Sequence, residues 1–274
     1  MELSGAVAVV TGSARGLGKS IAETFAAKGV HVALVDVLEH PLQESAAEIR
    51  ATGAHALPIV ADITDPTQVS VMADTVSSEL GPVDILVNNA GTFSVIGPVW
   101  EVDPEKWLRD IRVILCGSFL VCNAVLKEMV ERRVGYVINI VSSGGVGDPH
   151  PYSTSYASSK TGLMRLTEGL AKETQEHNVK VFAVGPPAIR TEMTRFIATD
   201  TAGKKWRPGF SDLFDEGRDT PPELVANFLI DLLSGRADRL TGRFFNPKQN
   251  FEQIIEQIDD ILENDLYTLR IRGK

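Results

Sequence analysis

Cysteine is scarce in this chain: among its 274 residues, only Cys116 and Cys122 are present. Both fall on one expected helix, six positions apart, and therefore on different faces of that helix. Neither a disulfide nor a metal site is expected from this pair. The composition predicts a protein of a reducing compartment, the cytoplasm, and no bound metal.

Basic charge is also in short supply. The chain carries 27 Lys and Arg against 36 Asp and Glu, a formal net charge of -9. No basic stripe is available for phosphates, which argues against a nucleic-acid partner and against docking on an anionic membrane. Residues 1–5 lack the basic segment of a signal peptide, and no apolar run approaches the roughly 20 residues that span a bilayer.

What the chain does have is a regular alternation of short apolar runs and amphipathic helical patterns. Apolar runs of this length, separated by helices, predict a parallel sheet that is covered on both faces. Right-handed crossovers then give an α/β fold, a doubly wound, Rossmann-like sheet of about seven strands. The runs are residues 6–10, 32–35, 56–61, 85–87, 136–141, 179–184 and 242–245.

No linker, repeat or low-complexity tract divides the chain, so we expect a single domain over residues 1–274. Two segments depart from the strand and helix alternation. One covers about residues 194–222, and the other is the tail, about residues 248–274.

A glycine-rich loop follows the first expected strand and precedes a helical pattern. Glycines allow a sharp turn and a close approach of the backbone to a pyrophosphate, whose charge then meets the N–H groups of the helix N-terminus. The loop predicts a dinucleotide site. Its contact residues are expected to be Gly12, Ser13, Arg15, Gly16, Leu17 and Gly18.

Asp36 stands at the carboxyl end of the second expected strand, 18 residues past Gly18. A carboxylate there can accept hydrogen bonds from the adenosine ribose hydroxyls and repel a 2′-phosphate. Arg15 acts in the opposite sense, because a guanidinium in this loop can pair with a phosphate. We expect NAD to be preferred, while NADP is not excluded.

The third signal is Tyr156 followed four residues later by Lys160, with Ser143 thirteen residues upstream. Residues at i and i+4 share one face of a helix, so the ammonium can lie beside the phenol. The adjacent cation is expected to lower the pKa of the phenol from about 10 toward neutrality. Ser143 could then hold a substrate oxygen beside the phenol.

Taken in order, these motifs resemble the short-chain dehydrogenase/reductase family over about residues 5–246. The resemblance implies that adenine contacts the segment after the third strand, that the end of the fourth strand lines the ribose, and that a later loop holds the carboxamide of the nicotinamide. The residues concerned are Asp62, Ile63, Asn89, Ala90, Gly91, Ile189 and Thr191.

The resemblance also implies catalytic roles. Tyr156 would be the general acid in ketone reduction and the general base in alcohol oxidation, and Ser143 would orient the carbonyl oxygen. Lys160 would additionally bind the nicotinamide ribose. Two positions depart from the family pattern: Ile114 stands where the family has a catalytic Asn, and Pro187 stands where the nicotinamide loop has Gly. The first predicts slow turnover or another proton route, and the second predicts a different loop path.

The segment 194–222 carries five large apolar residues among Gly and charged residues, which is typical of a mobile substrate lid. We therefore expect a hydrophobic, cyclic or aromatic, secondary alcohol or ketone as substrate. The alternative is that these side chains form core or subunit contacts. His150, between two prolines, is expected to be a surface histidine. The five residues are Phe196, Trp206, Phe210, Leu213 and Phe214.

The tail has apolar residues at helical spacing from Phe251 to Leu262. They would cover either their own domain or a neighbouring subunit, since the family generally forms homotetramers and a dimer or tetramer is expected. Residues 266–271 could also extend to a partner's active-site mouth. Both alternatives stay open at this point.

Three classes of function are compatible with these residues. The first is an NAD(P)-dependent oxidoreductase of a secondary alcohol or ketone. The second is an epimerase or dehydratase that uses transient hydride transfer on the same fold. The third is a dinucleotide-sensing protein that binds without turnover, which Tyr156 and Lys160 disfavour.

Overall fold

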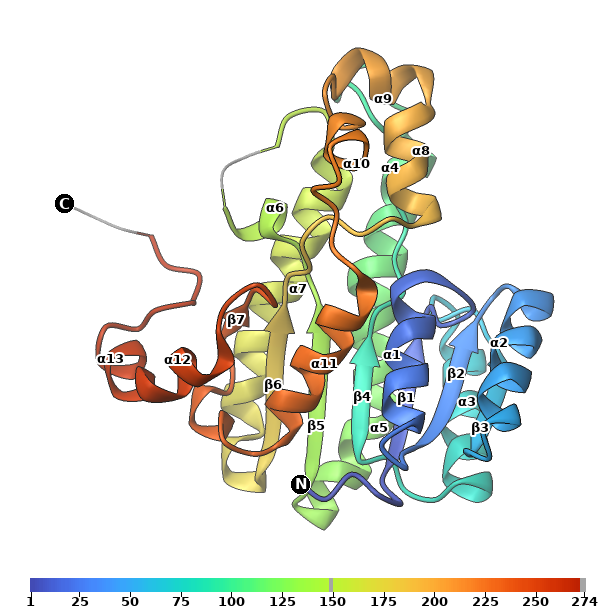
Figure 1. The fold of residues 1–274 in the computed structure, drawn as a ribbon, viewed down its shortest axis with the longest axis vertical. Coiled ribbons are helices and arrows are strands. Elements are labelled where there is room, and N and C mark those ends of the chain that lie inside the picture. Colours follow the sequence, from blue (N-terminus) through green and yellow to red (C-terminus); the bar gives the residue numbers. More distant parts are fainter. Residues whose placement is uncertain (148–149, 272–274) are drawn as a thin grey trace.

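The computed structural model describes residues 1–147 and 150–271. Its centre is one seven-stranded sheet in the order β3-β2-β1-β4-β5-β6-β7, with every neighbouring pair parallel (Figure 1). The predicted α/β fold and the predicted strands are confirmed, although the last strand is shorter than expected. The strands are β1 (Val7–Thr11), β2 (His31–Asp36), β3 (Ala56–Val60), β4 (Ile85–Asn88), β5 (Gly135–Ile140), β6 (Val179–Val184) and β7 (Phe244–Phe245).

The winding direction changes at β1. The chain first builds β2 and β3 on one side of β1, and then returns to place β4 on the other side. At such a switch point the loops after β1 and β4 diverge and leave a crevice at the carboxyl ends of the strands. The glycine-rich loop after β1 and the segment after β4 therefore border the same crevice.

Helices cover both faces of the sheet because strand residues alternate between them. Ala8 and Val10 belong to the core on one face, whereas Val7 and Val9 belong to the core on the other. The first face is covered by α1 (Gly16–Ala26), α2 (Glu39–Ala51) and α11 (Pro222–Leu233), and the second by α3 (Pro66–Glu79), α5 (Ser118–Arg132) and α7 (Thr154–Glu173).

The segment expected to be a lid folds into three short helices that stand above the carboxyl ends of the strands (Figure 1). These are α8 (Glu192–Thr199), α9 (Thr201–Trp206) and α10 (Asp212–Asp215). The remaining elements are α4 (Pro104–Ile111), the π-helix η1 (Arg112–Gly117), α6 (Ser143–Val146), the 3-10 turns η2 (Gln175–His177) and η3 (Asp238–Leu240), α12 (Phe251–Glu256) and α13 (Ile258–Glu263).

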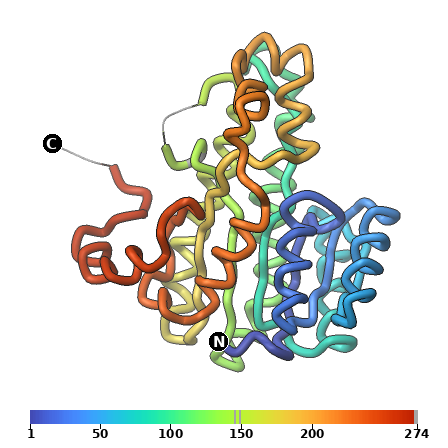
Figure 2. Tube along the Cα trace, in the orientation of Figure 1, coloured from blue at the N-terminus to red at the C-terminus, as the bar shows by residue number. Residues whose placement is uncertain are grey.

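The tail lies on its own chain. Phe251, Ile254 and Ile261 are buried against the first-face core. Beyond α13 the chain returns beside β7, where the Phe244 N–H donates to the Tyr267 carbonyl at 2.9 Å (Figure 2). Of the two alternatives for the tail, the structure shows the one in which it covers its own domain.

Both cysteines are free; Cys122 is buried, and Cys116 is exposed. The helical segment Pro104–Arg132 is long and apolar enough to cross a membrane by length and composition alone. However, Val121, Val125 and Met129 on this segment belong to the core beneath the sheet. Buried core helices pass the same test of length and composition.

Candidate active site

The glycine-rich loop has the shape that a pyrophosphate cradle requires. Gly12 and Gly16 have φ angles of +66° and +59°, a region that favours glycine. A Cβ on Gly18 would lie 2.2 Å from the Gly12 carbonyl oxygen, so no side chain fits there. The loop runs directly into the N-terminus of α1, which presents free N–H groups. These backbone features fit a dinucleotide.

Ser13 and Leu17 hold this loop rather than facing outward. The buried Ser13 hydroxyl donates to the Val10 carbonyl at 2.8 Å and accepts from the Val35 N–H at 2.9 Å. Leu17 is buried in the first-face core. The loop is thereby fixed to the ends of β1 and β2.

Asp36 is at the end of β2 beside the loop. Its two carboxylate oxygens accept from the backbone N–H groups of Ala14 and Leu38, each at 3.1 Å. Arg15 turns toward the lid, where it is 4.0 Å from a carboxylate oxygen of Glu192, and more than half of its side chain is exposed. Asp36 is therefore held in place, whereas Arg15 is free to move toward a ligand.

The end of β4 braces the glycine loop from the opposite side of the crevice. The Asn89 side-chain amide donates to the carbonyls of Thr11 and Gly12 at 2.9 and 3.0 Å. The Thr11 hydroxyl in turn accepts from the N–H groups of Asn89 and Ala90. Gly91 then lies against Ile114 and the Lys160 ammonium group.

The segment after β3 supplies the next wall of the crevice. One Asp62 carboxylate oxygen accepts from both the N–H and the hydroxyl of Thr64, at 2.8 Å each. Ile63 is buried against Gly117, where a Cβ would be only 2.7 Å from the isoleucine side chain.

The expected nicotinamide loop follows β6 and leads into α8. Ile189 is buried, and its carbonyl accepts from the Thr194 hydroxyl at 2.7 Å. Thr191 is the N-cap of α8 in a reciprocal capping box with Thr194. The Thr191 methyl group would be 3.4 Å from a Cβ on Gly16, so this loop and the glycine loop meet.

Tyr156 and Lys160 lie together on α7, as the sequence predicted. The Lys160 Nζ is 5.7 Å from the centre of the Tyr156 ring and donates to the Ile140 carbonyl at the end of β5. Lys160 is 3% exposed, and this burial lowers the pKa of its ammonium group to about 7.

The expected lowering of the tyrosine pKa is wrong. Burial raises the pKa of Tyr156 to about 12, and the charge of Asp110 acts in the same direction. A hydrogen bond with the Ser142 side chain works the other way and lowers the pKa of the phenol. Desolvation of the phenol is the largest cause of this shift.

The serine whose side chain interacts with the phenol is Ser142, and the catalytic role expected of its neighbour Ser143 stays a prediction. Ser142 is the N-cap of α6, is partly buried, and interacts with Tyr156. Ser143 is the first residue of the same turn and is exposed. Counting thirteen residues back from the tyrosine selects Ser143, but the backbone after β5 directs its neighbour toward the phenol. The sequence signal for Ser142 was only that two serines are adjacent.

The chain matches the family model for short chain dehydrogenases over residues 6–202. It belongs to the short-chain dehydrogenase/reductase family. The chain is 31% identical to 2,3-dihydro-2,3-dihydroxybenzoate dehydrogenase of Bacillus subtilis, over 87% of this chain and 93% of that protein. It is an NAD(P)-dependent oxidoreductase of a family whose members act on CH–OH groups.

Solved structures of this family agree with the fold. NAD+-bound xylitol dehydrogenase superposes with a TM-score of 0.82 at 25% identity, covering 90% of this chain and 98% of that chain. An actinorhodin polyketide ketoreductase with NADPH gives a TM-score of 0.81 at 28% identity, with 90% and 96% covered. The relatives thus include complexes with each of the two nicotinamide cofactors.

One departure from the family pattern concerns Ile114 in the π-helix. Ile114 is fully buried and packs in the cluster that contains Tyr156, while its carbonyl accepts from the Ser118 hydroxyl at 2.7 Å. Its side chain can neither donate nor accept a hydrogen bond. The π-helical turn, a feature often found at functional sites, places Ile114 in the cluster with Tyr156 but supplies no polar side chain from this position.

A functional residue that sequence reasoning missed is Asp110, on α4. It is fully buried and accepts hydrogen bonds from the Ser155 hydroxyl at 2.6 Å, the Thr92 hydroxyl at 2.7 Å and the Ser94 N–H at 3.0 Å. It thereby links the segment after β4 to the residue that precedes Tyr156. The only signal in the sequence was an acidic residue at a core-facing position.

The lid aromatics lie beside the phenol. Trp206 and Phe210 pack against a cluster of Phe93, Ile96 and Ile197 that Tyr156 also contacts. The ring centres of Phe93 and Tyr156 are 4.9 Å apart. Phe93, Trp206 and Phe210 thus belong to one apolar wall that includes the neighbour of the Tyr156 ring.

The other lid residues lie outside this wall. Phe214 packs edge-on against Phe210 and below the Arg190 guanidinium, Phe196 is 38% exposed, and Leu213 is partly buried. His150 is exposed, as predicted.

Proposed function

We propose that this protein interconverts a secondary alcohol and its ketone with NAD as the preferred cofactor, and that Tyr156 is its general acid and base. The observation that carries this proposal is the placement of Tyr156, Lys160 and Ser142 together at the carboxyl edge of the sheet. We infer that they face the crevice that the glycine loop borders, so that a bound nicotinamide would lie at the carbonyl carbon of a substrate while the phenol reaches its oxygen.

The roles of the side chains follow from their positions. In ketone reduction the Tyr156 hydroxyl gives its proton to the carbonyl oxygen, while the Ser142 hydroxyl donates a hydrogen bond that polarises that oxygen. In alcohol oxidation the Tyr156 oxygen accepts the proton of the substrate hydroxyl, and the Ser142 hydroxyl holds the same substrate oxygen. Lys160 supplies positive charge beside the phenol when protonated and would bind the nicotinamide ribose. When bound, the cofactor supplies the site that gives or takes the hydride.

The cofactor contacts follow the same assignment. Asp36 would bind the adenosine ribose, with its oxygens already aligned by two backbone N–H groups. Asp62 and Ile63 would border the adenine, and Ile189 and Thr191 the carboxamide. The apolar wall of Phe93, Trp206 and Phe210 supports a substrate with a hydrophobic body.

We further infer one cytoplasmic domain over residues 1–274, with the lid and tail as its appendages.

A panel of ketones and secondary alcohols with NADH, NADPH, NAD and NADP tests this proposal, by following absorbance of the reduced cofactor. We expect net cofactor oxidation with NADH and a loss of about 10²–10⁴-fold in Tyr156→Phe. Product change without net cofactor oxidation would support an epimerase or dehydratase instead. Cofactor binding with no turnover across the panel would support a dinucleotide sensor.

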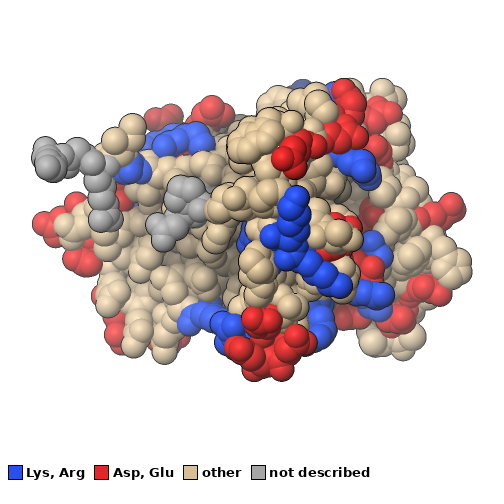
Figure 3. All heavy atoms as spheres, turned by 90° about the horizontal axis from the view of Figure 1, so that it is seen from above, with Lys and Arg blue, Asp and Glu red and all other residues tan. Residues whose placement is uncertain are grey.

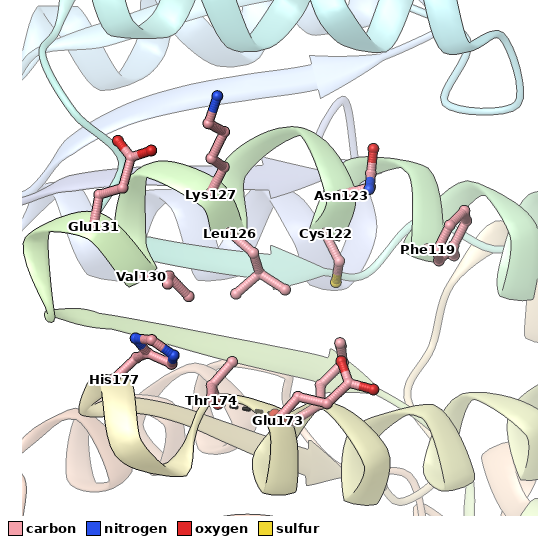
Figure 4. A pocket seen from close by; sticks show the side chains of 11 residues that line it. Phe119, Cys122, Asn123, Leu126, Lys127, Val130, Glu131, Glu173, Thr174 and His177 are labelled. Atoms are coloured by element: carbon pink, nitrogen blue, oxygen red, sulfur yellow. Dashed lines mark hydrogen bonds between the residues drawn. The ribbon is translucent and has the colours of Figure 1, made fainter.

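We also infer that the chain forms a homo-oligomer through the outer face of α5 and α7. These helices border a groove in which Leu126 and Val130 stand opposite Thr174 and His177 (Figure 4). Phe119 on α5 is 49% exposed.

Both signs of charge border this groove, with Lys127 and Glu131 on α5 and Glu173 on α7. Two copies related by a twofold axis can therefore pair opposite charges there. Light scattering of Phe119→Glu is expected to show a smaller assembly than the wild type, and an unchanged mass would refute this interface.

A further inference from the structure

Arg207, at the end of the lid helix α9, is a partly buried cation with no anionic partner among the residues that the structure describes. Three arginines of the described chain are partly buried: Arg132, Arg207 and Arg243. Arg132 pairs with Asp84 at 2.8 Å, and Arg243 pairs with Asp265 at 3.4 Å. Within the residues that the structure describes, Arg207 alone of the three forms no ion pair with a carboxylate. Partial burial of an unpaired charge is unfavourable, because the lost hydration is not offset.

In the described part of the chain, the guanidinium has one hydrogen bond and one aromatic neighbour. One N–H donates to the Ser153 hydroxyl at 3.1 Å, and the group lies 5.5 Å from the centre of the Phe210 ring. Burial lowers the pKa of Arg207, with no acidic group acting against this shift. Several of the five guanidinium N–H donors therefore have no partner in residues 1–147 and 150–271.

Arg207 is close to the reacting phenol. Ser153 is 2% exposed and is the N-cap of α7, three residues before Tyr156. The neighbouring Trp206 packs on Tyr152 with ring centres 4.6 Å apart, and both belong to the cluster that Tyr156 contacts. The cation is therefore bound to the N-terminus of the helix that carries Tyr156, beside the aromatic cluster that Tyr156 contacts.

A second positive feature adjoins the first. The Ser153 side chain makes no capping hydrogen bond, so the N–H groups at the start of α7 keep the partial positive charge of a helix N-terminus. Lys and Arg side chains also form a band across the middle of the face above the sheet, although the chain as a whole is acidic (Figure 3). Nothing on the apolar wall neutralises Arg207 from within the described chain.

We propose that Arg207 binds a carboxylate of the substrate, so that the substrate is a hydroxy acid or oxo acid with an otherwise apolar body. This inference rests on the proposed function and names the substrate class of the same site. The flat fork of a guanidinium matches a carboxylate in two parallel hydrogen bonds. A singly charged carboxylate also suits aromatic walls better than a phosphate dianion, whose desolvation is more costly.

Two matched pairs of compounds test the inference with the full chain and cofactor. For turnover, 4-oxocyclohexanecarboxylate is compared with its methyl ester. For binding without turnover, cyclohexanecarboxylate is compared with cyclohexanecarboxamide by calorimetry. The variants are Arg207→Met and Arg207→Lys, and the control is Lys204→Met, which removes an exposed cation from the same helix.

We expect the wild type to favour the acid of each pair. Arg207→Met should lower kcat/KM for the oxo acid and affinity for the carboxylate by about 10- to 100-fold, while the ester and amide change by less than about threefold. Arg207→Lys should retain part of the preference, because it keeps the charge but not the fork. Lys204→Met should behave as wild type.

The outcomes separate this inference from the proposed function. Turnover of both ketones that depends on Tyr156, with no preference for the acid, would overturn the role of Arg207 and leave the oxidoreductase assignment standing. Carboxylate binding that Arg207→Met abolishes, without turnover of either ketone, would support the anion site and count against the proposed reaction. Equal losses for charged and neutral compounds in Arg207→Met would also overturn the inference.

Discussion

The adjacent serines offer the sharpest test of the site, because they differ by one position and the structure gives them different environments. Ser142 is partly buried beside Tyr156, whereas Ser143 is exposed. Ser142→Ala removes the hydroxyl that would polarise the substrate oxygen, and such donors contribute about 10²–10³-fold to kcat. Ser143→Ala removes a hydroxyl that faces solvent, so its kcat is expected to stay within about threefold of wild type.

The structure also predicts the stability and the pH dependence of these variants. Ser142 caps a single turn, where its oxygen accepts from the Gly144 N–H at 3.2 Å, so Ser142→Ala should cost about 1 kcal/mol of stability. The Ser142 hydrogen bond lowers the pKa of Tyr156, so its removal should move the pH–kcat/KM profile of alcohol oxidation to higher pH.

The assay is steady-state alcohol oxidation from pH 6 to 11, with cofactor affinity and thermal unfolding measured in parallel. Ser142→Thr retains a hydroxyl and should recover part of the activity that Ser142→Ala loses. A severe loss in Ser143→Ala with a mild loss in Ser142→Ala would refute our assignment of the serine.

Three further predictions concern buried or cofactor-facing charge. Asp110→Asn removes a charge that raises the pKa of Tyr156, so the pH–rate profile should move to lower pH, with a stability loss of about 1–3 kcal/mol by urea unfolding. Burial lowers the pKa of Lys160 from 10.5 to about 7. Between pH 7 and 10.5 the free energy of unfolding of the wild type, measured without cofactor, should therefore rise relative to that of Lys160→Met. Parallel curves of unfolding free energy against pH would contradict this. Asp36→Ala should reduce kcat/KM for NAD by about tenfold and affect NADP less, as measured by cofactor titration.

Much of the fold was readable from local sequence. Strands β1 and β2 are continuous apolar runs because both of their faces are buried. Short runs of this kind are typical of strands in a parallel sheet that is covered on both sides. The glycines at 12, 16 and 18 and the Tyr156–Lys160 spacing were equally local, since a turn and a helix each fix residues only a few positions apart. Strand β7 was predicted too long because only Phe244 and Phe245 pair with β6.

Features that depend on distant segments could not be read in the same way. The donors that surround Asp110 come from the segment after β4 and from α7, and neither is near it in sequence. The direction of the Tyr156 pKa shift depended on how deeply the phenol is buried and on which side chains lie beside it. Spacing along one helix gives neither quantity.

The sequence by itself determined the doubly wound sheet, the dinucleotide cradle and the helix that carries Tyr156 and Lys160, because each follows from hydrophobic pattern or from residues within one turn. Only the tertiary structure decided that the Ser142 side chain interacts with the phenol, and that the tail covers its own chain. Both depend on how separate segments pack against one another, and packing across the sheet has no fixed spacing in the sequence.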